Sequence, residues 1–226
     1  MNITDPPTER ASALTDVLVA VLAIICAIRL VRIGASDRQR SGIWSAVFWL
    51  LAFSALLGAV SHGIEMPPAV NELLWQPLFL GLGLTVALFA VGMLHDLWGA
   101  RASRRALPVF LALGVGFYLV RLILAGSFLF FIVFEGVVMV LSFVACSILA
   151  LRGRLPGAGL MLVGIVLTIL AAMAQAVDTV AVPVIWLDHN GVFHVIQLAA
   201  ILYLVAGIGR GLQTPARSVG DKPPQR

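Results

Sequence analysis

Three of the four histidines in this sequence stand at the edges of hydrophobic segments, and their chemistry is the most specific in the chain. His62 ends the second such segment, whereas His194 lies in the first turn of the seventh, shortly after His189. Ionisable groups at membrane depth are costly, so those that occur there are candidates for function. Neutral imidazole binds zinc well, and a catalytic zinc site commonly has three protein ligands and a water. We therefore predict a zinc site held by His62, His189 and His194.

The place of His189 in this site depends on where the last helix begins. On one unbroken helix, His189 and His194 would point roughly 140° apart and could not share a face. The dipeptide Asn190-Gly191 predicts that the helix begins there, which leaves His189 on the preceding loop, able to fold back. Glu65, one turn or less beyond His62, is the alternative third ligand.

Other polar residues close to these histidines could complete a hydrolytic site. A bound metal ion lowers the pKa of its water towards neutrality and so supplies hydroxide as a nucleophile. Glu65 or Glu72 would act as general base or as a further ligand. Ser61 and Gln197 would orient a ligand or the bound water.

Four further charged residues fall at or inside the hydrophobic segments. Asp16 and Asp178 lie at segment ends, a position typical of acids in contact with water, and we predict that both are solvated. Glu135 lies well inside the fifth segment. We predict that Arg121, near the end of the fourth segment, is its ion partner.

The elements that must position these residues are membrane helices. The 226 residues are 61% hydrophobic and only 12% charged, far from the roughly one quarter charged residues of soluble domains. One crossing of a bilayer takes about 20 apolar residues. We predict an all-α bundle of seven transmembrane helices forming one domain over residues 1–212, with a disordered tail over 213–226. The predicted spans are Leu14–Val31, Ile43–Ser61, Leu73–Leu94, Ala106–Leu124, Phe128–Leu151, Gly159–Val177 and Val192–Ile208.

Basic residues predict the orientation of this bundle. They crowd into alternate loops and the C-terminal tail, while the other loops carry only Arg10 and Arg121. The positive-inside rule therefore places the N-terminus outside and the C-terminus in the cytoplasm. We expect an integral protein of a bacterial cytoplasmic membrane.

Composition also limits the partners. The net charge of +4 could suggest nucleic acid, but the arginines stand at helix ends rather than on one soluble face, so we expect no nucleic-acid partner. The expected partners are membrane lipid and a lipid-like substrate, and the sequence does not determine the oligomeric state. Cys26 and Cys146 both fall inside hydrophobic segments, so no disulfide is expected.

A histidine near the end of the second helix and two at the start of the seventh resemble the CREST superfamily of alkaline ceramidases and adiponectin-type receptors. That family carries Ser-x-x-x-His in helix 2, an aspartate near helix 3 and His-x-x-x-His in helix 7. The resemblance implies a zinc-dependent hydrolase that cleaves an amide bond in a lipid. Here Gly58 stands four residues before His62, one extra residue separates His189 from His194, and Glu65 and Glu72 are the nearest substitutes for the aspartate.

Two alternative functions use the same residues differently. His62 and His194, at equal depth on two helices, could be the axial ligands of a haem in an electron-transfer protein. No Cys-x-x-Cys-His sequence is present, which excludes covalent c-type attachment. In a non-catalytic transporter or receptor, Glu135 and Arg121 would be pathway charges and the histidines would respond to pH.

Overall fold

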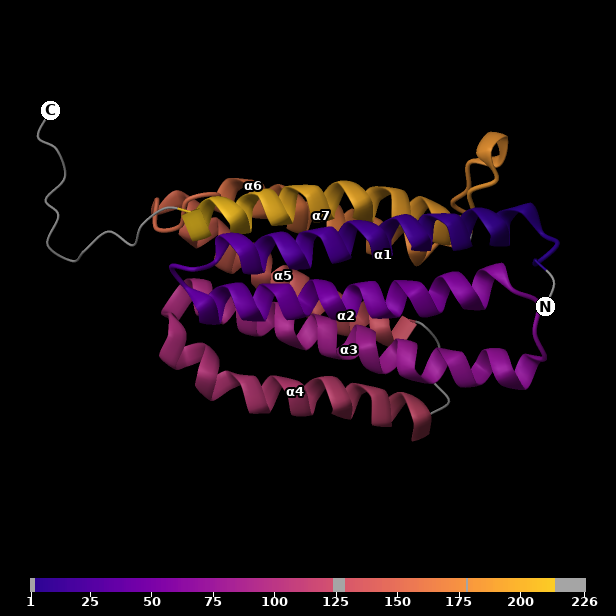
Figure 1. Cartoon of the computed structure of the whole chain (residues 1–226), viewed down its shortest axis with the longest axis horizontal. Coiled ribbons are helices and arrows are strands. Elements are labelled where there is room, and N and C mark those ends of the chain that lie inside the picture. Colours follow the sequence, from indigo (N-terminus) through magenta and orange to yellow (C-terminus); the bar gives the residue numbers. More distant parts are fainter. Residues whose placement is uncertain (1–2, 124–128, 178, 214–226) are drawn as a thin grey trace, which may run out of the picture.

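The computed structural model of the chain describes residues 3–123, 129–177 and 179–213. Its seven α-helices run side by side along the long axis of the molecule (Figure 1). Each is long and apolar enough to cross a membrane, which confirms the predicted all-helical bundle and an integral membrane protein. The elements are α1 (Pro7–Ile33), α2 (Arg38–Gly63), α3 (Pro68–Trp98), α4 (Ala100–Ile123), α5 (Leu129–Leu151), α6 (Ala158–Gln175), the 3-10 turn η1 (Pro183–Ile185) and α7 (His189–Gln213).

The first four helices and the last extend beyond the predicted spans because polar first or last turns are also helical. α1, for example, begins at Pro7 and has Glu9 in its first turn. Proline suits the first helical position, where no N–H partner is needed, and an acid there interacts favourably with the helix dipole. Hydropathy does not detect such turns. The predicted tail and the turn after α4 lie outside the described residues, except that Gln213 ends α7.

Six helices form a closed ring, and one lies outside it. The neighbours around the ring are α1, α2, α3, α5, α6 and α7, with α7 again beside α1, while α4 packs on the outer side of α3 (Figure 1). The close approach of α3 and α4 depends on glycine. A Cβ atom on Gly83 would lie 2.8 Å from the carbonyl oxygen of Gly114.

The bundle has two distinct ends. We call the end where α2 finishes and α7 starts the His194 end, and the opposite end, where α2 starts and α7 finishes, the Arg40 end. The connections α1–α2, α3–α4 and α5–α6 all lie at the Arg40 end, so the arginine-rich loops share one side of the molecule (Figure 1).

Ion pairs join neighbouring helices at the Arg40 end, and the side chains of Arg40, His95 and Asp96 are buried. Arg40 Nε lies 2.5 Å from Asp96 Oδ1, and its Nη1 donates to the carbonyl of Ile208 on α7. His95 is 3.0 Å from both Asp37 Oδ2 and Ser103 Oγ. The side chains of His95 and Asp96 are both buried within this network.

Candidate functional site

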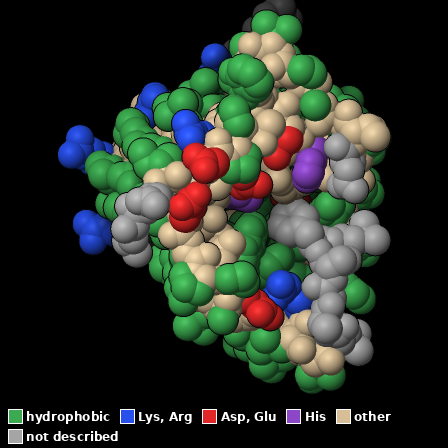
Figure 2. All heavy atoms as spheres, turned by 90° about the vertical axis from the view of Figure 1, so that its right-hand side faces the viewer, with side chains coloured by type: hydrophobic (Ala, Val, Ile, Leu, Met, Phe, Trp, Pro, Cys, Tyr) green, Lys and Arg blue, Asp and Glu red, His purple; other side chains and the backbone are tan. Residues whose placement is uncertain are grey.

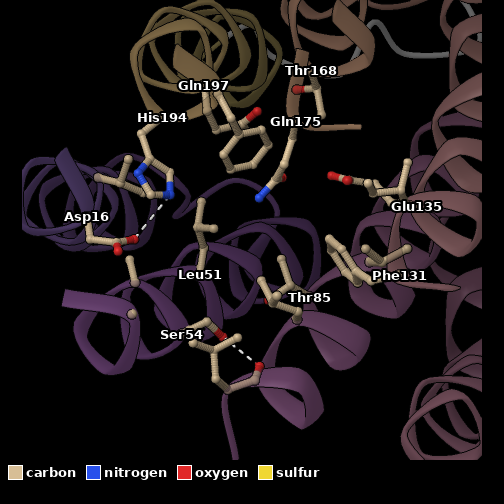
Figure 3. A pocket seen from close by; sticks show the side chains of 18 of the residues that line it. Asp16, Leu51, Ser54, Thr85, Phe131, Glu135, Thr168, Gln175, His194 and Gln197 are labelled. Atoms are coloured by element: carbon tan, nitrogen blue, oxygen red, sulfur yellow. Dashed lines mark hydrogen bonds and ion pairs between the residues drawn. The ribbon is translucent and has the colours of Figure 1, made fainter. Parts of the chain in front are cut away.

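A cavity of about 760 Å³ lies inside the ring of helices, nearer the His194 end. All six ring helices line it, and Arg121 of α4 adds one side chain. Its walls are largely apolar, with Phe48, Leu51 and Phe79 among them. A pocket of this size, apolar with a few polar groups, is typical of small-molecule sites. Figure 3 shows the polar groups facing one another from different helices.

The polar group with the clearest geometry is formed by His194 of α7 and two residues of α1. His194 Nε2 lies 3.2 Å from Asp16 Oδ1, and its Nδ1 lies 2.9 Å from Thr15 Oγ1. Asp16 and His194 are only 5% and 8% exposed. Figure 3 shows the imidazole and the carboxylate meeting at one side of the cavity.

The hydrogen bonds at this group admit two proton arrangements. The single proton of Thr15 Oγ1 can go to the carbonyl of Ser12 or to His194 Nδ1. With that proton on Nδ1, the second ring nitrogen Nε2 carries a hydrogen and donates it to Asp16 Oδ1. With it on the carbonyl, Nε2 becomes an acceptor, and Nε2 and Oδ1 then need a shared proton or a common cation.

The other predicted histidine ligands also line this cavity. His62 Nδ1 lies 2.7 Å from Glu9 Oε2, and its ring stands edge-on to Trp75. His189 lies at the rim, half-buried. The structure therefore brings all three histidines to one cavity. Within residues 3–123, 129–177 and 179–213, however, no three His, Cys, Asp or Glu side chains lie close enough together to hold a metal ion.

His189 does not lie on a loop as predicted, because Asp188 caps the helix before Asn190. Asp188 Oδ1 accepts from the backbone N–H of Gly191 at 2.9 Å and from Ser12 Oγ at 3.0 Å. These two hydrogen bonds hold the pKa of Asp188 below its usual range although burial opposes ionisation. His189 is consequently the first residue of α7 and cannot fold back towards His194.

The prediction that Asp16 is solvated at the surface is wrong, and a periodic signal in the sequence could have corrected it. Buried small residues follow Asp16 at helical spacing, at Ala20, Ala23 and Ala27. Such a stripe predicts the face of a membrane helix that packs against its neighbours. Figure 2 shows acidic and histidine side chains gathered at the His194 end. Asp178 lies outside the described residues.

The predicted catalytic residues Glu65, Glu72 and Ser61 do not line the cavity. Both glutamates are exposed, Glu65 after α2 and Glu72 in the first turns of α3. Ser61 is buried, but its hydroxyl donates to the side chain of Asn71. Gln197, by contrast, lines the cavity as predicted, and its Oε1 has no hydrogen-bond partner among the described residues.

The predicted ion pair between Glu135 and Arg121 is not among the ion pairs of the described residues. Both side chains line the cavity, but Arg121 donates to Gln76 Oε1 and lies over the ring of Phe79. Four of the five buried side-chain polar atoms without a hydrogen-bond partner in the described part of the chain belong to cavity-lining residues. They are Asp16 Oδ2, Arg121 Nε, Glu135 Oε2 and Gln197 Oε1.

This fold and cavity define an integral membrane protein with a ligand-sized, partly polar pocket enclosed by its helices. The chain belongs to the family of unknown function DUF6962, which matches residues 11–213 and so extends from within α1 to the last residue of α7. No curated protein and no solved structure matches the chain.

Proposed function

We propose that this protein is a zinc-dependent, membrane-embedded hydrolase that cleaves an amide or ester bond in a lipid-like substrate. The observation that carries the proposal is the buried contact between His194 Nε2 and Asp16 Oδ1, at 3.2 Å, in a cavity that His62 also lines. A buried imidazole paired with a carboxylate is suited to acid–base catalysis and to metal binding.

The side chains that meet at this contact are of types that bind metal ions. Imidazole and carboxylate are zinc ligands, and Asp16 Oδ2 is buried without a hydrogen-bond partner among the described residues. His62 contacts Glu9 through Nδ1, and a carboxylate on the second ring nitrogen is common for metal-ligating histidines. In this proposal His194 and Asp16 would hold the ion, while His62 and His189 line the same cavity. Zinc, when bound, supplies hydroxide near neutral pH.

The side chains around His194 then have separate tasks. Thr15 accepts from Nδ1 and so keeps Nε2 directed at Asp16. The water that the ion activates would supply both the attacking hydroxide and the proton that the leaving group takes up. Gln197, one turn after His194 on the same helix, lies beside this group and can orient the carbonyl that is attacked.

Gly58 connects this proposal with the resemblance to the CREST superfamily. The family pattern has serine where this chain has Gly58, four residues before His62. A Cβ atom at position 58 would lie only 2.7 Å from Asp16 Oδ2. The glycine therefore leaves room for the Asp16 carboxylate, which in this proposal takes over the polar role of the missing serine.

We also infer the orientation and location of the protein from its charges. The Arg40 end carries the arginine-rich connections and would face the cytoplasm by the positive-inside rule. The His194 end, with its cavity, would then face outward, in the cytoplasmic membrane of a bacterium.

The proposal is tested by metal analysis and hydrolysis assays on the purified protein. We expect about one zinc per chain and cleavage of long-chain acyl amides or esters that release a fluorophore. His194→Gln and Asp16→Asn should each lower the rate about 100-fold or more, because each removes a proposed ligand of the ion. Asp5→Asn, at an exposed acid outside the cavity, is the control and should keep the wild-type rate.

Two results would overturn this proposal. One is a protein without stoichiometric metal whose hydrolysis is unaffected by His194→Gln. The other is a visible absorption spectrum with a haem band that disappears in both His62→Ala and His194→Ala, which would establish the electron-transfer alternative instead.

A further inference from the structure

The cavity has a second polar centre, at Glu135 on α5. Figure 3 shows its carboxylate pointing into the cavity from the side opposite His194 and Asp16. Glu135 is 8% exposed, and its Oε2 has no hydrogen-bond partner among the described residues. A buried carboxylate needs a proton, hydrogen bonds or an opposite charge to offset the loss of water.

No basic side chain of residues 3–123, 129–177 and 179–213 forms an ion pair with Glu135. The cavity-lining arginine, Arg121, instead donates to Gln76 at 3.3 Å and stacks on Phe79, with 3.5 Å between its guanidinium carbon and the ring centre. Its position on α4, outside the ring of six helices, places it at the margin of the cavity. A positive charge that pairs with Glu135 therefore has to come from outside the described residues.

The hydroxyl groups that line the cavity cannot satisfy Glu135 either. Thr85 and Thr168 donate to backbone carbonyls of their own helices at 2.8 Å and 3.1 Å. Ser54 donates to a backbone carbonyl of α3 at 3.4 Å. A hydroxyl has one proton, so these three present only lone pairs to the cavity. They add to the unpartnered acceptor atoms of Asp16 and Gln197.

We propose that Glu135 binds the protonated amine of an amphiphilic ligand whose apolar part fills the cavity. An ammonium group has up to three donors and a positive charge, which matches a carboxylate that shares its cavity with other unpartnered acceptor atoms. Phe131, one turn before Glu135, also lines the cavity and can contact the cation through its ring. The identification of this amine as the substrate of the hydrolase rests on the proposed function. Binding of an amine at Glu135 does not require hydrolysis.

The test compares dodecylamine with 1-dodecanol, which have equal chains but differ in charge. Binding to the full-length protein in lipid nanodiscs near neutral pH is followed by tryptophan fluorescence, because Trp75 lines the cavity. We expect the amine to bind about tenfold tighter than the alcohol, and Glu135→Gln to abolish this preference. Glu135→Asp, which keeps the charge, should retain it in part. Asp5→Asn, at an exposed acid outside the cavity, should retain it fully.

Equal affinity of the wild-type protein for the two probes would overturn the inference without any variant. A Glu135→Gln protein that still prefers the amine, or an Asp5→Asn protein that loses the preference, would do the same. His194→Gln separates this site from the proposed reaction. It should stop hydrolysis and leave the amine preference unchanged, so the failure of one proposal is distinguishable from the failure of the other.

Discussion

The two ends of the bundle differ in how completely their buried carboxylates are paired. At the Arg40 end, charged side chains meet as pairs, Arg40 with Asp96 and His95 with Asp37. Towards the His194 end, Asp16 and Glu135 keep carboxylate oxygens without hydrogen-bond partners among the described residues, and both line a cavity. Paired buried charges hold helices in register, whereas unpartnered ones are retained where a ligand supplies the partner.

This contrast assigns stability to one end and function to the other. Arg40 joins α2 to Asp96 of α3 and to the carbonyl of Ile208 on α7, so its loss would loosen three helices together. Asp16 and Glu135 make fewer contacts than their polar atoms allow. Polar atoms left unpaired in a cavity lower the stability of the bundle and are available to bind a ligand.

The largest loss of stability is expected when the Arg40–Asp96 pair is broken. Asp96→Asn leaves the Arg40 guanidinium buried without an opposite charge, which should lower the free energy of unfolding by about 3–5 kcal/mol. Asp16→Asn, at the other end, removes a carboxylate with a free oxygen and should change it by less than about 1 kcal/mol. Unfolding in mixed micelles, followed by circular dichroism, measures both.

Asp5→Asn is the surface control for this comparison. Asp5 pairs with Arg10 at 3.4 Å with both side chains exposed, and such pairs contribute about 0–1 kcal/mol. If Asp16→Asn destabilised the protein as much as Asp96→Asn, the division between a structural and a functional end would be wrong.

A second large effect is expected at Gly157, in the turn that leads into α6 at the Arg40 end. Its φ of +87° is in the left-handed region, and an added Cβ would lie 2.2 Å from the carbonyl oxygen of Gly207. Gly157→Ala should therefore lower the free energy of unfolding by about 2–4 kcal/mol, from backbone strain and from separation of α6 and α7.

Gly159 is the matched control, because a Cβ there would meet nothing within 4 Å. Gly159→Ala should be neutral or slightly stabilising, since alanine favours helix more than glycine does. The same unfolding assay compares the two variants. Equal stability of the two alanine variants would show that α6 and α7 do not approach as closely as the structure has them.

The smallest effect is expected at Asp188, which caps α7 at the His194 end. Its pKa is lowered in the folded protein, so its stabilisation is present above about pH 4 and is lost as the pH falls through the folded-state pKa. Asp188→Ala should cost about 1 kcal/mol near neutral pH and progressively less in acid. A difference between wild type and variant that does not shrink in acid would contradict this assignment.

Much of the fold could be predicted because hydropathy is a local property. A run of about 20 apolar residues must become a helix wherever it lies in a bilayer, so all seven helices were predictable, with errors confined to their ends. Alternation of direction then places His62 and His194 at the same end. That inference needed only the number of crossings and is confirmed.

The partners of the polar side chains were decided by tertiary structure alone. Asp16 contacts His194 although 178 positions separate them in the chain, and Arg121 contacts Gln76 instead of Glu135. Such contacts depend on how each helix is rotated about its axis and on which helix stands next to it. Neither is set by hydropathy, because apolar side chains cover nearly the whole circumference of these helices and leave close packing to select the faces that meet.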